Sequence, residues 1–432
     1  MKENYQIAYE SWKGETSAKT ASWIAPLQTA ALTRFLQLGF PTLKDEEWKY
    51  TNVEPIAQTE FDFPFESSIR KVGQNEIDPY AFGQKDWNRL IFVNGIYQQE
   101  SSLISKPAGV EIKTLREALL SDENLKNYLA KQADFKNNAF IALNTAFLYD
   151  GAFVFVPDGK VIPEPIHLMF FSVSEDENII AQPRNLFILG EGARVKIIES
   201  YISFSPAHNF TNTVTEIFLN AGARLEHYKI QRESPSAYHI GAIQAIVNRD
   251  SHLSSFSFSL GGQLSRTNLN VCLAEQGAHC ELNGLYLAKD HQHVDHHTVI
   301  DHAKPNGTSR QNYKGVLMNQ SRAVFSGKIF VRQDAQKTDA NQINKNLLLS
   351  EGASVDTKPQ LEIFADDVKC THGAAVGQLE PETIFYVKSR GFSEESARKL
   401  LTHGFASEIV DEVKIEPVRS HLDQLVWQIL EK

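Results

Sequence analysis

The middle of the chain repeats one short pattern: Gly192-Ala-Arg-Val195, Gly222-Ala-Arg-Leu225, Gly277-Ala-His-Cys280 and Gly352-Ala-Ser-Val355. Each copy places a glycine turn directly before a segment in which apolar and polar residues alternate. Such alternation predicts a β-strand with one buried face. The four copies therefore predict strands that all start from the same kind of tight turn.

Two weaker copies, Asp250-Ser-His-Leu253 and Gln320-Ser-Arg-Ala323, fall in the gaps, and most successive copies then begin roughly 30 residues apart. Regular self-similarity with strand patterning predicts a solenoid, in which each coil buries its apolar face only by stacking on the next. We therefore expect a mainly β protein with a parallel β-helix over residues 136–380. A β-sandwich with irregular hairpins is the alternative, because Gly-Ala turns are common.

Residues 1–135 are expected to form a mainly helical subdomain before the β-helix. Ala21–Leu38 has the apolar spacing of a helix that ends at Gly39. Leu90–Tyr97 is typical of a hairpin with an Asn-Gly turn. Thr114–Lys131 returns to a helical pattern.

Residues 381–432 are expected to form a C-terminal helical subdomain. Pro381 suits the first position of a helix, and Gly391 its end. Ser393 caps the next helix, which we expect to end at Gly404. Further helices are expected over 406–413 and 420–430, with a break at Pro417.

The composition excludes several classes of protein. The 432 residues suffice for two or three units, and 42% hydrophobic residues suffice for a large core. A net charge of −10 argues against a nucleic-acid partner. The start is polar and lacks the apolar region of a signal peptide, and the most apolar stretch, Ala139–Pro157, is interrupted by polar residues. Three cysteines do not form a secreted disulfide framework. We expect a cytoplasmic protein that spans no membrane.

Cys370 and His372 are the first candidate metal ligands. They lie two residues apart on a predicted strand, so the thiol and the imidazole share one face. Structural zinc takes four ligands, and cluster iron prefers thiolates with imidazole possible. The pair is half a site that another chain would have to complete, or else two half-buried strand residues.

The second candidate is the histidine-rich segment Asp290–His302. On a strand, His291, His293, Asp295 and His297 share one face, while His296 and His302 occupy the other. Consecutive side chains on one face lie about 6.5–7 Å apart, so a single ion reaches more than two of them only at a bulge. We favour hydrogen bonds to neighbouring coils over a metal site.

Nucleotide and hydrolase motifs are missing. Gly14–Thr20 lacks the glycine before the lysine of a phosphate loop, and Gly190–Val195 lacks the third glycine of a dinucleotide fingerprint. We therefore expect no catalytic residue, and any ATP hydrolysis must come from a partner.

Three motifs together resemble the SufB/SufD family of the SUF iron–sulfur cluster assembly complex: Asp45–Thr51, the histidine-rich segment, and the tail over 368–405. The resemblance implies a right-handed β-helix between helical ends. Gly373 stands where SufB-like chains have glutamate, and residues 341–348 hold no cysteine, so the chain is more similar to the SufD branch.

The resemblance also implies partners and roles. A SufD-like chain pairs with SufB, and its C-terminal helices dock the SufC ATPase. His372 would take part in cluster assembly at the junction with SufB, with weaker support for Cys370. The cluster would be transient, and no cofactor is expected to bind the isolated chain stably. A homodimer of the isolated chain is plausible. The candidate docking residues, which alternatively pack the helices on the solenoid, are Phe385, Phe392, Leu400 and Phe405.

Two other functions remain open from the sequence. One is a stand-alone metal-binding solenoid that uses the histidines of 291–302. The other is a carbohydrate-active β-helix protein, against which the polar start of the chain argues.

Overall fold

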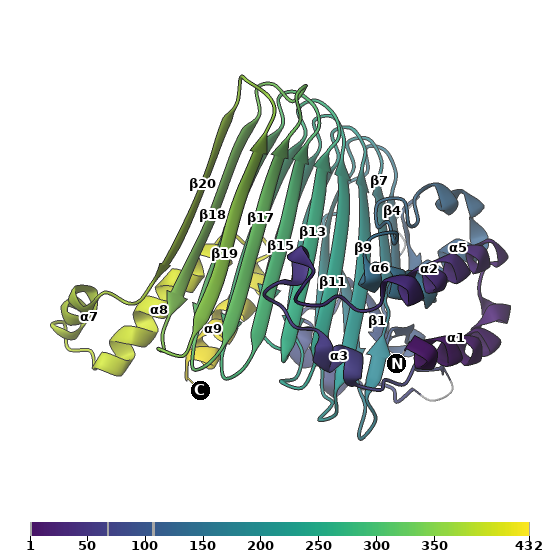
Figure 1. Ribbon diagram of the computed structural model, residues 1–432, viewed down its shortest axis with the longest axis horizontal. Helices are drawn as coiled ribbons and strands as arrows, with labels where there is room; N and C mark the ends of the chain where they lie inside the picture. Colours follow the sequence, from purple (N-terminus) through teal and green to yellow (C-terminus); the bar gives the residue numbers. More distant parts are fainter. Residues whose placement is uncertain (1, 67–68, 106–108, 432) are drawn as a thin grey trace.

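The computed structural model describes residues 2–66, 69–105 and 109–431, and these form a long β-solenoid with helices at both ends (Figure 1). The strands belong to two facing sheets. In spatial order, sheet 1 contains β2 (Ile96–Tyr97), β1 (Asn88–Val93), β5 (Ile166–Ser172), β8 (Arg194–Ser203), β10 (Arg224–Arg232), β12 (His252–Ser259), β14 (His279–Ala288), β16 (Thr308–Leu317), β18 (Asp339–Leu348) and β20 (Lys369–Gly377). Sheet 2 contains β19 (Ser354–Ile363), β17 (Arg322–Val331), β15 (His293–His302), β13 (Leu264–Leu273), β11 (Tyr238–Val247), β9 (Asn209–Leu219), β7 (Arg184–Leu189), β4 (Ala152–Val156) and β3 (Glu111–Thr114), and β6 (Ile179–Ala181) also pairs with β9.

From β8 onward the chain alternates between the sheets, and from β9 onward each strand pairs in parallel with the strand two elements earlier. Among the described strands, the antiparallel pairs are β1–β2 and β3–β4, both at the N-terminal end. The predicted β-helix is therefore confirmed, and the alternative of a sandwich built from hairpins is wrong. The expected hairpin with Asn94 and Gly95 at its turn is the β1–β2 pair, and both residues have positive φ.

The repeated pattern marks strand starts in both sheets. Gly192, Gly222 and Gly277 precede strands of sheet 1, whereas Gly352 precedes β19 in sheet 2. The interpretation of all copies as one series was wrong, because the same turn chemistry serves both sheets. The true coil is visible within sheet 1, whose strands from β8 to β20 start about thirty residues apart.

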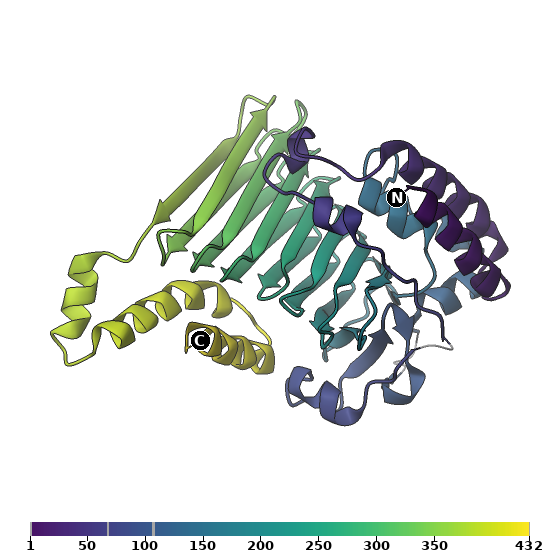
Figure 2. The ribbon, with the colours of Figure 1, turned by 60° about the horizontal axis from the view of Figure 1, so that its bottom comes forward.

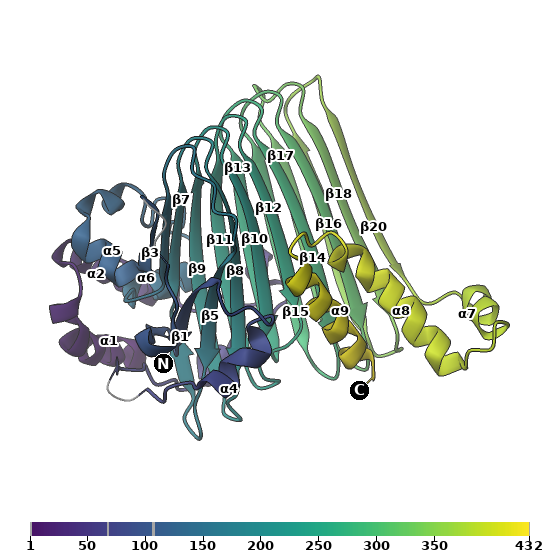
Figure 3. The ribbon, with the colours of Figure 1, turned by 180° about the vertical axis from the view of Figure 1, so that it is seen from behind.

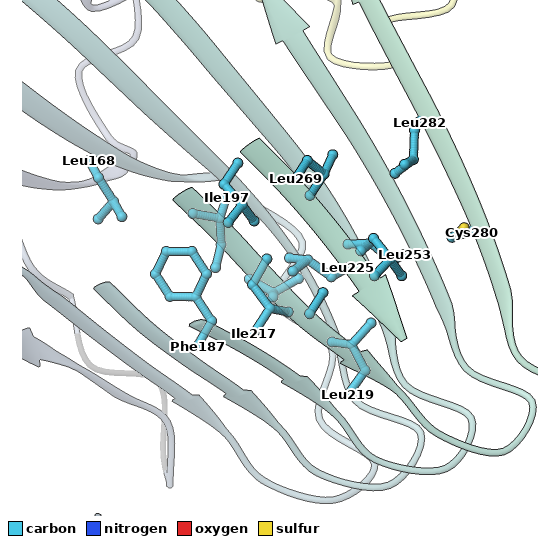
Figure 4. Close-up of a cluster of buried hydrophobic side chains, with 14 of the residues drawn as sticks. Leu168, Phe187, Ile197, Ile217, Leu219, Leu225, Leu253, Leu269, Cys280 and Leu282 are labelled. Carbon is cyan, nitrogen blue, oxygen red and sulfur yellow. The ribbon is translucent and has the colours of Figure 1, made fainter. Parts of the chain in front are cut away.

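The main core fills the space between the two sheets. Alternate residues of every strand point inward, as the strand period requires. The close-up in Figure 4 shows Leu225 and Leu253 of sheet 1 together with Ile217 and Leu269 of sheet 2 in this cluster. Their side chains are at most 1% exposed, so stacking of coils removes them from water almost completely.

In two neighbouring coils, a tyrosine of each strand lies beside a glycine of the other. Gly284 of β14 lies beside Tyr313 of β16, and Gly315 of β16 lies beside Tyr286 of β14. A Cβ on either glycine would overlap the neighbouring ring. The two rings therefore lie in the interior only because the adjacent position on the next strand has no side chain.

Helices cover the N-terminal end of the solenoid. They are α1 (Lys2–Thr16), α2 (Ala25–Leu38), α3 (Glu54–Gln58), α4 (Gln74–Ile77), α5 (Leu115–Ser121) and α6 (Ala139–Ala146). The helix expected over Ala21–Leu38 is confirmed from Ala25, and Gly39 follows it with φ of 69°. The helix expected over Thr114–Lys131 was too long: α5 stops at Ser121, and a 3-10 helix follows over Glu123–Asn127.

The C-terminal helices are α7 (Pro381–Lys388), α8 (Glu394–Val410) and α9 (Glu416–Glu431). Figure 2 shows α8 and α9 along one side of the solenoid, with α7 beyond its end. The prediction that Gly404 ends a helix was wrong. Helix α8 continues through it, because Ala406, Ile409 and Val410 are buried in the cluster that includes the outer face of sheet 1. Pro417 lies in the first turn of α9 instead of separating helices.

No helix in the described part of the chain combines the length and the apolar character needed to cross a membrane.

Candidate functional site

The last coil of the solenoid is open. Within the described residues, β20 pairs only with β18, and β19 pairs only with β17. Figure 3 shows β20 as the outermost strand, directly before α7. An edge strand leaves backbone N–H and C=O groups available to another chain. This open end therefore combines two free strand edges with the inward-facing side chains of the final coil.

Cys370 and His372 lie on β20 and face the interior of the solenoid at its open end. In the register of the sheet, Cys370 is beside Ala340 and His372 is beside Gln342. Both neighbours on β18 are buried. His372 itself is exposed, and Cys370 is half-buried against a small apolar cluster that includes Ile329. The shared face predicted for the pair is thus the inward face of β20.

Cys370 and His372 supply only part of the ligands that a metal or cluster site needs. Burial raises the pKa of the Cys370 thiol, so this cysteine is not a preformed thiolate. Gln342, beside His372, has neither side-chain nitrogen nor oxygen hydrogen-bonded although both atoms are buried. Within the described residues, neither Cys370 nor His372 belongs to a group of three potential metal ligands. A metal or cluster at this place would need ligands from outside the chain.

Apolar side chains are exposed around the same end. Ile363 and Phe364, at and just after the end of β19, are 40% and 59% exposed. Val376 on β20 is 48% exposed. Large apolar groups that are left in water beside free strand edges are typical of an interface.

Of the four candidate docking residues on the C-terminal helices, three are exposed. Phe385 of α7 is 72% exposed, Phe392 between α7 and α8 is 48% exposed, and Leu400 of α8 is 40% exposed. Phe405 instead packs against the cluster between sheet 1 and the helices. Lys314 of β16 lies over its ring and donates a hydrogen bond to its carbonyl oxygen, 3.1 Å away. Phe405 therefore anchors α8 on the solenoid.

The histidine-rich segment forms strand β15 and contacts the Asp45–Thr51 segment on the outer face of sheet 2. Figure 1 shows this N-terminal segment crossing in front of the strands. The Thr51 hydroxyl donates to Asp295 Oδ2 over 2.6 Å, which leaves its oxygen to accept from His293 Nε2, 2.9 Å away. Glu47 Oε2 lies 3.3 Å from His297 Nδ1.

Arg266 completes this contact from the neighbouring coil. Its Nη1 donates to Asp295 Oδ2 over 2.7 Å and to the carbonyl oxygen of Glu47 over 2.7 Å. Its guanidinium stacks on the ring of Trp48, 3.7 Å from the centroid. A buried cation thus joins the N-terminal segment to two coils of the solenoid. The outward side chains of the segment thus have structural partners, but these lie mainly in the N-terminal segment and only in part in the neighbouring coil that was expected.

Charges in this contact hold each other ionised. Burial alone would raise the pKa of Asp295, but Arg266 and His297 hold it far below its usual range. Burial alone would lower the pKa of His297, but Asp295 and Glu47 raise it above its ordinary value. On the inner face, burial lowers the pKa of His296 to about 3, so this imidazole is neutral.

The contact was missed from the sequence. Both motifs were recognised, but nothing in either motif shows that the other is its partner. The available signal was Arg266, an arginine inside an alternating strand pattern, which needs a buried partner when it lies on a covered face.

A parallel β-solenoid with helical ends and an open last coil defines the class of this protein. The family model for the SufBD core domain of SUF system FeS cluster assembly matches residues 171–405, and the model for the SufBD protein N-terminal region matches residues 1–168. The chain belongs to the SufBD family of iron–sulfur cluster assembly proteins.

Individual relatives agree over nearly the whole chain. An iron–sulfur cluster assembly SufBD family protein of Synechocystis is 34% identical over 399 residues, which cover 90% of this chain and 87% of the relative. The iron–sulfur cluster assembly protein SufD of Escherichia coli is 32% identical over 408 residues, with 94% and 93% covered. The chloroplastic protein ABCI7 of Arabidopsis thaliana is 30% identical over 426 residues, with 95% and 87% covered.

Proposed function

We propose that this chain is a SufD-type accessory subunit, without catalysis of its own, that pairs with SufB and carries the SufC ATPase during iron–sulfur cluster assembly. The observation that carries the proposal is the open solenoid end with Cys370 and His372 on its inward face. The family membership and the similarity to SufD support the same conclusion.

Pairing with SufB uses the free edges of β20 and β19. A second solenoid placed against this end satisfies the free backbone groups and covers Ile363, Phe364 and Val376. The partner must be matched in shape, because both sheets end in the same coil. In the absence of SufB, a second copy of this chain can use the same edge, so the isolated protein is expected to form homodimers.

Cluster assembly takes place at this junction. The chain offers one thiol and one imidazole, whereas a cluster is normally held by four ligands. SufB therefore supplies the remaining ligands, and the nascent cluster is cargo of the pair. Pairing would also change the environment of Cys370, whose thiol is half-buried in the free chain.

SufC docking uses α7 and the start of α8. Phe385, Phe392 and Leu400 are exposed there, and α7 lies beyond the end of the solenoid (Figure 2). Phe405 supports the surface from beneath by fixing α8 on sheet 1. ATP hydrolysis by SufC moves these helices. The movement is transmitted to the junction, because β20 ends at Gly377, only four residues before α7 begins.

Co-purification of the three proteins tests both contacts separately. Phe385→Ser with Phe392→Ser should lose SufC and keep SufB, whereas Val376→Asp should lose SufB and keep SufC. The controls are Leu120→Ser and Val161→Asp, which change exposed apolar residues elsewhere. Retention of both partners by both variants would contradict the proposed surfaces.

A further inference from the structure

Two imidazoles and a carboxylate meet on the outer face of sheet 1, away from both regions described above. His252 begins β12 and His279 begins β14, and the register places them side by side. Glu281 lies two residues after His279, so it is on the same face of the sheet. Each of the three side chains has one potential ligand atom that lies within 4.8 Å of those of the other two.

The spacing approaches that of a metal centre. His279 Nε2 lies 3.3 Å from Glu281 Oε1, and His252 Nε2 lies 3.8 Å from Glu281 Oε2. Tetrahedral ligands at the usual zinc distances of 2.0–2.1 Å are about 3.3 Å apart. The two rings are almost perpendicular, with an interplanar angle of 83° and centroids 4.3 Å apart. Small side-chain rotations therefore suffice to bring all three groups onto one ion.

One of these groups lacks a partner. His252 Nε2 is buried and has no hydrogen bond, because its 3.8 Å separation from Glu281 exceeds hydrogen-bond distance. An unsatisfied buried polar atom costs free energy that a bound cation would recover.

The neighbouring strand orients the second histidine. The hydroxyl of Thr308, the first residue of β16, is in hydrogen-bond contact with His279 Nδ1. In the structure, His279 Nε2 is also within hydrogen-bond distance of Glu281 Oε1, a contact in which only the nitrogen can donate. With an ion bound, Nδ1–H would donate to the Thr308 hydroxyl instead, which leaves the lone pair of Nε2 for the ion. Such outer partners fix the tautomer of metal-binding histidines.

The group is also accessible. The side chains of His252, His279 and Glu281 are 28%, 26% and 36% exposed. The residues of β14 that pack beneath the C-terminal helices, Leu285 and Leu287, lie further along the strand. The partial exposure of all three side chains gives an ion access to the group from solvent.

We propose that His252, His279 and Glu281 bind one divalent transition-metal ion, with Zn²⁺ and Fe²⁺ as the ions that suit two imidazoles and one carboxylate. Three protein ligands and an open position are typical of zinc and non-haem iron sites. No thiolate takes part, so the site is distinct in chemistry from Cys370, which lies on the inner face of the same sheet. The inference does not depend on pairing with SufB or docking of SufC.

Metal titration of the full, untagged chain tests the site. Metal-free protein is titrated with Co²⁺ and followed by its visible absorption, and then Zn²⁺ and Fe²⁺ are added anaerobically in competition. We expect one equivalent of Co²⁺ to bind without a thiolate charge-transfer band, and its displacement by Zn²⁺ or excess Fe²⁺ would show that these ions compete for the same site. Failure of the wild-type chain to bind any of the three ions would overturn the proposal.

Variants decide which residues bind the ion. His279→Ala and Glu281→Gln should each lose the stoichiometric ion, and Thr308→Val should weaken binding about 10–100-fold. His291→Ala, which changes an exposed histidine elsewhere, should bind as the wild type does. Equal binding by His279→Ala and the wild type would overturn the assignment. Circular dichroism of each metal-free variant verifies folding, and His252→Asn replaces any variant that fails to fold.

Discussion

Replacing Arg266 by methionine should detach the Asp45–Thr51 segment from the solenoid. The guanidinium is 2% exposed and Asp295 is fully buried, with 2.7 Å between Nη1 and Oδ2. Removing one partner of a buried ion pair costs about 3–5 kcal/mol, because the other charge stays buried and unpaired. Asp295 keeps the Thr51 hydroxyl and His297 as partners, so we expect a loss near the lower limit, about 3 kcal/mol.

A second substitution separates the charge effect from lost packing. Adding Asp295→Asn to Arg266→Met removes the orphaned carboxylate, so the double variant should be less destabilised than the sum of the two single variants by about 2 kcal/mol. The free energy of unfolding is measured in urea, and hydrogen exchange is measured at residues 45–51. A loss below about 0.5 kcal/mol for Arg266→Met, with unchanged exchange at this segment, would refute the reasoning.

Two further predictions concern buried positions of the solenoid strands. Gly315→Ala should lower the free energy of unfolding by about 1–3 kcal/mol, because the added Cβ overlaps the ring of Tyr286. The control Gly373→Ala places its Cβ in open space and should leave the melting temperature unchanged. Equal melting temperatures of the two variants would contradict this packing. Burial lowers the pKa of His167 and of His296 to about 3 from 6.5, so the unfolded chain binds more protons between these values and stability falls as the pH drops from 6.5. Each histidine should lower the free energy of unfolding at pH 5.0 by about 2 kcal/mol relative to pH 7.5, and His167→Gln should remove the contribution of His167. Urea unfolding at both pH values measures this difference. Equal stability of the wild type at both pH values would contradict the prediction.

Local sequence patterns predicted where strands begin, but not to which of the two sheets each strand belongs. The Gly-Ala turns at Gly192 and Gly352 predicted strand starts correctly, but the turn chemistry is the same in both sheets. Gly404 has the chemistry of a helix end, yet burial of Ile409 and Val410 outweighs the roughly 1 kcal/mol cost of an internal glycine. Tertiary packing of this kind is not visible in a local window.

The candidate site was likewise predictable from the sequence only in part. The strand period placed Cys370 and His372 on one face, but their inward direction depends on the register with Ala340 and Gln342 of β18. The pairing of Thr51 with Asp295 joins residues 244 positions apart and follows from how the N-terminal segment crosses the solenoid. Long-range contacts of this kind need the assembled fold.

Anaerobic iron and sulfide analysis of the complex with SufB and SufC tests the role of the open end most directly. The wild type is compared with His372→Ala and with Thr371→Ala, which changes an exposed neighbour on the opposite face of β20. We predict that all three complexes assemble and that only His372→Ala contains far less iron and sulfide. Normal cluster content in the His372→Ala complex would contradict a chemical role for the open end and leave this subunit a mechanical partner.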